Sequence, residues 1–237
     1  MRRLPAVILL NILGIALFVS WYLPSHHGFW SRLDTAIFLF FNHIAASSHS
    51  YAVFLAVTNY RAFDITSLLA MGLLYLHYLL RTPPDRRYQL ISLGIVMLLS
   101  ALVLNQLGHL LPVSRPSPTL FFQNEDGVVR VSQFSRIPTK DASMDSFPGD
   151  HGMMLMIFAA YMLRYFGGRA FACGMAIVVL FSLPRVMIGA HWFSDIAVGS
   201  LSVVLVGLSW WLMTDASDKA VSWFNQRLPG VRDRRYQ

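Results

Sequence analysis

Long apolar stretches, each close to the length needed to cross a lipid bilayer, constrain most strongly how this chain can fold. A helix that crosses the apolar core of a bilayer needs roughly 20 mostly apolar residues. Hydrophobic residues make up 55% of the 237 residues and charged residues only 13%, whereas about a quarter of a soluble domain is charged. The stretches are spread along the chain, so they predict one domain over residues 1–237, an all-α polytopic membrane helix bundle.

Six of these stretches are predicted to span the membrane. The first follows Arg2 and Arg3 as a signal peptide would, but no small-residue cleavage site follows it, so we interpret it as an uncleaved helix. A further apolar stretch, 35–57, is interrupted by polar residues and is interpreted as interfacial or irregular. The six predicted spans are 5–23, 62–80, 89–111, 151–166, 170–188 and 192–213.

The placement of basic residues orients this bundle. Six spans put both termini on one side, and that side holds twelve of the nineteen Lys and Arg residues, against seven on the other side. Because cytoplasmic segments are enriched in Lys and Arg, both termini are predicted to be cytoplasmic. The longest loop, 112–148, is then on the outer side, and the polar tail, 214–237, is cytoplasmic.

Charge and cysteine content exclude several other interpretations. The formal charge of +7 does not indicate a nucleic-acid partner, because the basic residues mark topology and form no binding face. The single cysteine, Cys173, lies in an apolar stretch, so the chain can form no internal disulfide and has no cysteine-based metal motif. The protein is therefore predicted to be embedded in the bilayer. No sequence pattern indicates its oligomeric state.

Ionisable residues recur at the outer ends of the predicted spans. They are Arg115, His151, Arg185, His191 and Asp195. Leaving such groups unpaired in lipid is costly, so a cluster of them on one side of the membrane indicates a functional site. His109 lies close to this cluster and its role is left open. The remaining histidines are interpreted as ordinary interfacial residues; these are His26, His27, His43, His49 and His77.

The spacing within the cluster favours phosphoryl transfer. Asp195 lies four residues after His191, so on a helix it can accept a hydrogen bond from one ring nitrogen and leave the other as a nucleophile. Arg115 and Arg185 offer planar forks of donors that match phosphate oxygens. The segment 148–151 precedes a predicted helix, whose free N–H groups favour an anion.

Within that segment, Gly149 is expected to let the backbone approach the phosphate. His151 is placed to protonate a leaving oxygen, as a general acid does. A nucleophile, an acid and a cationic phosphate site together are what phosphoryl transfer requires.

These residues resemble the three motifs of the type-2 phosphatidic acid phosphatase superfamily, which comprises lipid phosphatases and phosphotransferases. The third motif is present from Arg185 to Asp195, with Pro184 where the family has serine. The family's Pro-Ser-Gly-His motif corresponds to 148–151, which contains Asp150. The first motif keeps Arg115 and the proline after it, but the family's lysine falls on Gly108.

The resemblance implies a role for each matching residue. His191 would form a phosphohistidine, Asp195 would support it, and His151 would be the general acid. Arg115 and Arg185 would hold the phosphate, with no metal or other cofactor.

Two departures from the family pattern make the phosphate site less positive. The family's lysine is missing, and Asp150 adds a carboxylate beside the phosphate. Lys140 of the outer loop is predicted to supply the missing cation.

Stretches around the motifs, together with 59–64 and 138–143, look like one branch of the family, found in the inner membrane of Gram-negative bacteria. This likeness implies transfer of the distal phosphate of undecaprenyl pyrophosphate to the 1-phosphate of Kdo2-lipid A. The products would be lipid A 1-diphosphate and undecaprenyl phosphate, and the site would face the periplasm.

Three other interpretations remain open at the level of the sequence. The site could hydrolyse undecaprenyl pyrophosphate or another lipid phosphate, since water can attack the same intermediate. His151, Asp150, His191 and Asp195 could bind zinc in a metal-dependent hydrolase. In a different class of protein, the same groups could relay protons in a proton-coupled membrane transporter.

Overall fold

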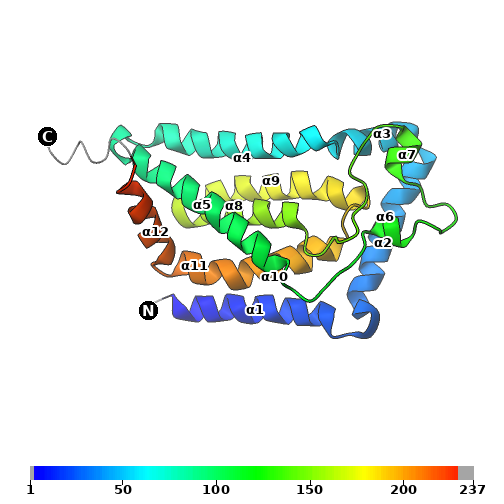
Figure 1. Ribbon diagram of the computed structural model, residues 1–237, viewed down its shortest axis with the longest axis horizontal. Coiled ribbons are helices and arrows are strands. Elements are labelled where there is room, and N and C mark those ends of the chain that lie inside the picture. Colours follow the sequence, from blue (N-terminus) through cyan, green and yellow to red (C-terminus); the bar gives the residue numbers. More distant parts are fainter. Residues whose placement is uncertain (1–2, 229–237) are drawn as a thin grey trace.

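A computed structural model describes residues 3–228 of the chain as helices joined by turns and loops. Within these residues, five helical stretches are long and apolar enough to cross a membrane, and they match five of the six predicted spans. They run side by side along the long axis of the molecule (Figure 1). The stretches are α1 (Leu4–Tyr22), α4 (Arg61–Arg81), η2 with α5 (Pro84–Arg86, Arg87–Gly108), α9 (Gly168–Met187), and η3, α10, η4 and α11 in succession (Asp195–Ser200, Leu201–Val203, Val204–Leu208, Ser209–Met213).

The sixth predicted span is α8 (Asp150–Phe166), which lies between α5 and α9 in Figure 1. Its 17 residues rise by roughly 26 Å, slightly less than the roughly 30 Å apolar core of a bilayer. Small residues bring it close to α9, since a Cβ added to Gly174 would lie 3.0 Å from the Cα of Ala159. Close contact through small residues is how helices commonly associate in membranes.

The stretch 35–57 is helical, so the expectation of irregular structure there is wrong. It falls in α2 (Gly28–Ser47) and α3 (His49–Thr58), which follow the short η1 (Ser25–His27). The two helices are separated at Ser48, whose side chain accepts a hydrogen bond from the Tyr51 N–H and so caps α3. Figure 1 shows α2 crossing the end of the bundle almost at right angles to the long helices. Its interfacial location stays a prediction.

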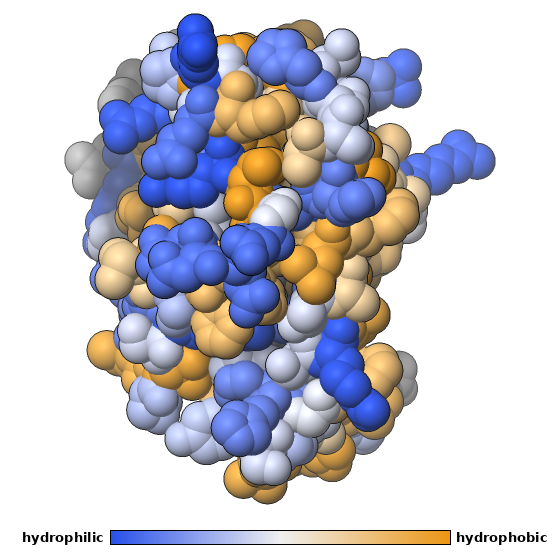
Figure 2. Space-filling view, turned by 90° about the vertical axis from the view of Figure 1, so that its right-hand side faces the viewer, coloured by the Kyte–Doolittle hydropathy of each residue, from blue (hydrophilic) through white to orange (hydrophobic). Residues whose placement is uncertain are grey.

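The long loop predicted over 112–148 lies at the same end of the bundle as α2 and α3 (Figure 1). It is mostly irregular and contains two short helices, α6 (Pro118–Phe121) and α7 (Val131–Ser135). Figure 2 views the molecule from this end, where hydrophilic side chains cover much of the surface and apolar ones are scattered among them. Such a face suits water and lipid headgroups better than acyl chains.

The opposite end of the bundle carries the start of α1 and the final helix α12 (Ala216–Asn225) (Figure 1). Arg164 of α8 holds α12 in place through an ion pair with Asp218 at 2.8 Å. The first described residues and α12 thus lie at one end, and their cytoplasmic location stays a prediction. Of the predicted tail 214–237, residues 229–237 lie outside the described residues.

Candidate active site

The turn between α9 and η3 carries the central histidine. Pro184 stands inside the last turns of α9, and the N–H groups of Ala190 and His191 both donate to the Arg185 carbonyl, at 3.0 and 3.2 Å. Gly189 has a φ of +83°, and an added Cβ would lie 2.4 Å from the Thr119 hydroxyl oxygen, so only glycine fits there. His191 therefore lies in a tight turn before η3, not on a helix with Asp195 as expected.

His191 is oriented by a backbone carbonyl. Its Nδ1 lies 2.9 Å from the carbonyl oxygen of Ser146, and a carbonyl can only accept, so the neutral ring carries its proton on Nδ1. Nε2 is left with a lone pair, as a nucleophile requires. The expected hydrogen bond to Asp195 is not made, because Nδ1 and Oδ2 of Asp195 are 3.6 Å apart. The carboxylate is still close enough to stabilise a positive charge on the ring.

Asp195 belongs to a buried network of charges that includes a residue absent from the sequence prediction. Oδ2 of Asp195 accepts the Trp192 N–H at 2.8 Å, and Oδ1 lies 3.5 Å from Nη1 of Arg115. The same Arg115 binds Asp34 of α2 through Nη2 at 2.9 Å. Ser194 joins the three, because its hydroxyl accepts from Arg115 and donates to Asp34.

The network changes the interpretation of two of its members. Burial raises the pKa of Asp34, while Ser194 and Arg115 oppose that rise. Arg115 also lies over the Trp192 ring, 4.2 Å from its centroid, as cation–π contacts require. Its fork is thus engaged with protein carboxylates, whereas the sequence assigned it to substrate phosphate.

Arg185 has one buried donor that is not used within the protein. Nη2 of Arg185 binds the carboxylate of Asp64 on α4, and Nη1 is buried without a hydrogen-bond partner. A buried donor without a partner costs free energy unless a ligand satisfies it. The unpaired Nη1 is therefore free to donate to a ligand, and phosphate binding by Arg185 stays a prediction.

His151 lies within the same cluster. Arg185, Asp64, His191 and Lys140 are all close enough to His151 to interact with it electrostatically. Lys140 thus lies within electrostatic reach of His151, whereas the family's lysine position is occupied by Gly108. A Cβ added to Gly108 would lie 2.9 Å from the Met153 side chain and 3.1 Å from the Pro148 ring, so any larger residue there would crowd α8 and the segment before it.

Asp150 has a partner of its own. Its Oδ1 lies 2.9 Å from Nε2 of His109, and both side chains are partly exposed, at 47% and 39%. His109, whose role the sequence left open, thus contacts Asp150. The pair stands at the start of α8, beside His151.

Gly149 is occupied by protein contacts. Its N–H donates to the carbonyl of Asp195 at 3.0 Å, and its own carbonyl accepts from the Ser200 hydroxyl at 2.7 Å. A Cβ on Gly149 would lie 2.9 Å from Ile196. Glycine is needed here because α8 and η3 approach closely, and the N–H expected to approach phosphate is already bonded.

Three residues of the site were missed from the sequence, namely Asp34, Asp64 and Ser146. The two carboxylates had a signal, since an acid within or beside an apolar stretch needs a partner. Ser146 had none, because it acts through its backbone carbonyl. Among residues 3–228, no group of three or more His, Cys, Asp or Glu side chains is arranged to hold a metal; a metal-free mechanism stays a prediction.

Asp64 is expected to matter through Arg185. Replacing Asp64 with alanine lets the Arg185 fork rotate, and we expect phosphate transfer to fall about 10- to 100-fold, because small misplacements of a binding group have effects of that size. Asp64→Asn keeps a hydrogen-bond acceptor and should lose less. Initial rates measure this, with Asp126→Asn, an exposed acid of the outer loop, as the matched control. Wild-type rates in both Asp64 variants would contradict the role.

Comparison with known proteins adds independent information. The family model described as the PAP2 superfamily matches residues 89–219. The lipid A 1-diphosphate synthase of Escherichia coli (strain K12) is 54% identical over 230 residues, 97% of this chain and 96% of that protein. A second protein of the same organism, "Putative undecaprenyl-diphosphatase YbjG", is 29% identical over 52% of this chain and 56% of its own length. No solved structure matches the chain.

Proposed function

Because this chain belongs to the PAP2 superfamily, as its motifs predict, we propose that it is a lipid phosphotransferase that acts through a phosphohistidine on His191. The donor is undecaprenyl pyrophosphate, which gives up its distal phosphate. The acceptor is the 1-phosphate of Kdo2-lipid A, so that the products are lipid A 1-diphosphate and undecaprenyl phosphate. The choice of acceptor rests on the relative of 54% identity that covers nearly the whole chain.

The observation that carries the chemistry is the orientation of His191. With Nδ1 donating to the Ser146 carbonyl, the lone pair of Nε2 is available to attack a phosphorus atom. Arg185 supports this assignment with its buried and unpaired Nη1, a donor for the charge that develops on the phosphoryl oxygens.

In the first step, Nε2 of His191 bonds to the distal phosphorus and the P–O bond to undecaprenyl phosphate breaks. His151 donates its proton to the leaving oxygen. The ring of phosphorylated His191 gains positive charge, which Asp195 stabilises from 3.6 Å. In the second step, His151 takes back a proton from the acceptor phosphate, an oxygen of that phosphate bonds to the phosphorus, the P–N bond breaks, and Nε2 regains its lone pair. One phosphoanhydride is replaced by another, so the reaction needs no nucleotide.

Two cations near the phosphates complete this proposal. Arg185 holds the transferred phosphoryl group, and Lys140, which interacts with His151, takes the place of the family's missing lysine. Arg115 contacts the Asp195 carboxylate through Oδ1 and so adds a positive charge beside it. The site lies at the end of the bundle away from α12, and the distribution of basic residues supports a location at the periplasmic face of the inner membrane.

Hydrolysis is the second candidate, and the likeness to an undecaprenyl-diphosphatase favours considering it. Water and lipid A compete for the same phosphohistidine, so only the acceptor distinguishes the two reactions. A proton-coupled transporter is disfavoured, because the ionisable groups gather at one end of the bundle and the chain is a PAP2 member.

Labelled phosphate distinguishes these candidates. Purified protein in detergent is given undecaprenyl pyrophosphate labelled in its distal phosphate, with and without Kdo2-lipid A. We expect the label on lipid A, at a rate that rises with acceptor concentration, and little free phosphate. Release of free phosphate that is indifferent to the acceptor would instead establish a lipid pyrophosphatase.

A further inference from the structure

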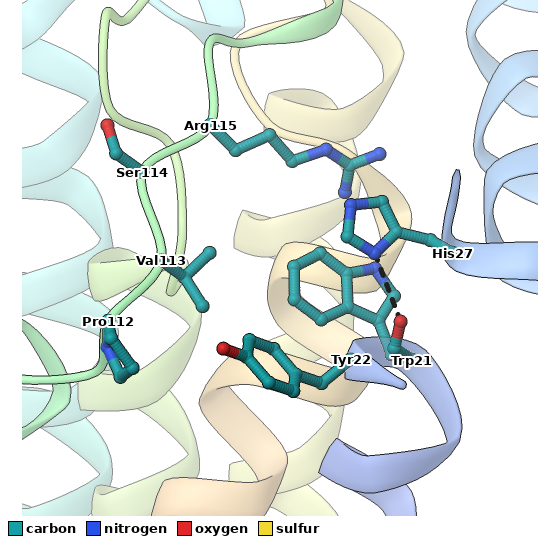
Figure 3. A pocket seen from close by; sticks show the side chains of 7 residues that line it. All are labelled: Trp21, Tyr22, His27, Pro112, Val113, Ser114 and Arg115. Atoms are coloured by element: carbon teal, nitrogen blue, oxygen red, sulfur yellow. Dashed lines mark hydrogen bonds between the residues drawn. The ribbon is translucent and has the colours of Figure 1, made fainter. Parts of the chain in front are cut away.

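A cavity of about 230 Å³ opens beside the active site, at the outer end of α1. Trp21 and Tyr22 form its floor, and the segment from Pro112 to Arg115 forms a wall. Figure 3 shows the Arg115 guanidinium and the His27 ring together on one side, with Pro112 and Val113 across from them. Nothing in the proposed chemistry at His191 uses this space.

The chain builds one side of the cavity with a strained backbone. His26 and His27 both have positive φ angles, 52° and 58°, although the left-handed conformation costs a residue other than glycine roughly 1–2 kcal/mol. This conformation stacks the His27 ring on Trp21 at 4.0 Å, and Nδ1 of His27 donates to the Trp21 carbonyl at 3.0 Å. Such strain is found where a side chain must be held for a ligand.

The cavity and the catalytic residues share structural elements. Trp21 stacks on Phe147 at 4.4 Å, the residue directly after Ser146, whose carbonyl orients His191. Arg115 lines the cavity and also contacts Asp195. The Asp195 carboxylate contacts both Arg115, at 3.5 Å, and Nδ1 of His191, at 3.6 Å, so one residue links the wall of the cavity to the catalytic histidine.

The chemistry of the lining selects between the two lipids. The donor phosphate is attached to an undecaprenyl chain, which is wholly apolar, whereas the acceptor phosphate is attached to a sugar with hydroxyl groups. The cavity offers the Tyr22 hydroxyl, the Arg115 guanidinium and Nε2 of His27, which is an acceptor when Nδ1 carries the proton. A few polar groups among aromatic rings suit a sugar better than a hydrocarbon chain.

We propose that this cavity binds the sugar ring that carries the acceptor phosphate, and so aligns that phosphate with phosphorylated His191. The proposal rests on the proposed function, since it requires a glycolipid acceptor. It also revises the interpretation of His27 as an ordinary interfacial residue.

The test compares two acceptors and two pocket variants. The acceptors are Kdo2-lipid A and a phosphatidic acid, which offers a phosphate monoester without a sugar. His27→Asn removes the ring, and asparagine tolerates the left-handed backbone; Tyr22→Phe removes only a hydroxyl. His26→Asn is the matched control, because His26 shares the strained segment without lining the cavity. Phosphorylation of His191 by labelled donor alone is measured for each protein.

We expect both pocket variants to raise the KM for Kdo2-lipid A about tenfold, the effect of losing one good hydrogen bond. Phosphorylation by the donor should stay at the wild-type rate, any transfer to phosphatidic acid should be unaffected, and His26→Asn should behave as wild type. An unchanged KM for Kdo2-lipid A in both variants overturns the proposal. So does a loss of phosphorylation by the donor that is as large as the loss of transfer to Kdo2-lipid A. Failure of the wild-type protein to transfer label to lipid A would instead refute the proposed function.

Discussion

Replacing His191 with alanine is expected to abolish transfer and hydrolysis together, by roughly four orders of magnitude or more, as the loss of a nucleophile does in other enzymes. In the proposed mechanism both reactions pass through the same phosphohistidine, so no acceptor should rescue the variant. The fold should persist, since the ring makes one hydrogen bond, to the Ser146 carbonyl, and the turn is held by backbone bonds to Arg185.

The measurement is twofold. Label transfer from undecaprenyl pyrophosphate gives the rate, and trapping of labelled protein, stable to alkali and labile to acid, identifies a phosphohistidine. His43→Ala, at an exposed position on α2, controls for the loss of a histidine. Residual turnover within tenfold of wild type would mean that another group attacks the phosphorus.

The apolar patterning of the sequence was enough to predict the helical bundle. Spanning helices need about 20 apolar residues whatever their neighbours are, so five predicted spans match the structure within a few residues. The stretch 35–57 was harder, because a polar residue within it can bond a partner that lies far along the chain. Asn42, for example, both donates to and accepts from the backbone of Val129.

The motif residues of the candidate site were predictable, but their partners and connections were not. The family motifs name His191, Asp195, His151, Arg185 and Arg115, and the structure gathers them at one end of the bundle. The spacing of His191 and Asp195 suggested a hydrogen bond on a helix, yet the chain turns at Gly189 and the Ser146 carbonyl accepts the hydrogen bond from Nδ1 of His191. A hydrogen bond to a backbone carbonyl cannot be predicted from the pattern of side chains, because every residue has such a carbonyl.

Asp34 illustrates the remaining gap between sequence and structure. It lies 160 residues from Ser194 in sequence, yet it accepts hydrogen bonds from both the N–H and the hydroxyl of that residue. Its carboxylate is fully enclosed, with 0% of the side chain exposed. An acid buried this deeply requires a cation, and that cation is Arg115.

Replacing Arg115 with alanine is therefore expected to lower the stability of the fold as well as the activity. Two buried carboxylates, Asp34 and Asp195, lose their cation, and breaking a buried pair in this way costs about 3–5 kcal/mol. If Arg115 served mainly to bind substrate phosphate, the same change would raise KM and leave the unfolding temperature unchanged. Thermal unfolding in detergent, measured beside transfer rates, distinguishes the two roles.

The dependence on pH follows from the sign of the Asp34 shift. Burial already raises the pKa of Asp34 while Arg115 opposes the rise, so removing Arg115 raises that pKa further. A raised carboxyl pKa means that the folded state favours the protonated acid, and folding loses stability as the pH rises above the ordinary value for aspartate. The stability deficit of Arg115→Ala relative to wild type should thus narrow as the pH falls.

The double variant Arg115→Ala/Asp34→Asn completes the test, because the amide carries no charge that needs a cation. It should be more stable at neutral pH than Arg115→Ala alone, with the non-additivity expected of residues in contact. Arg115→Lys keeps a positive charge but loses the planar fork that reaches Ser194 and Asp34 together, so its stability should lie between those of wild type and Arg115→Ala. Strictly additive effects of the Arg115 and Asp34 substitutions would show that the two residues do not support each other, and that Arg115 is held for substrate instead.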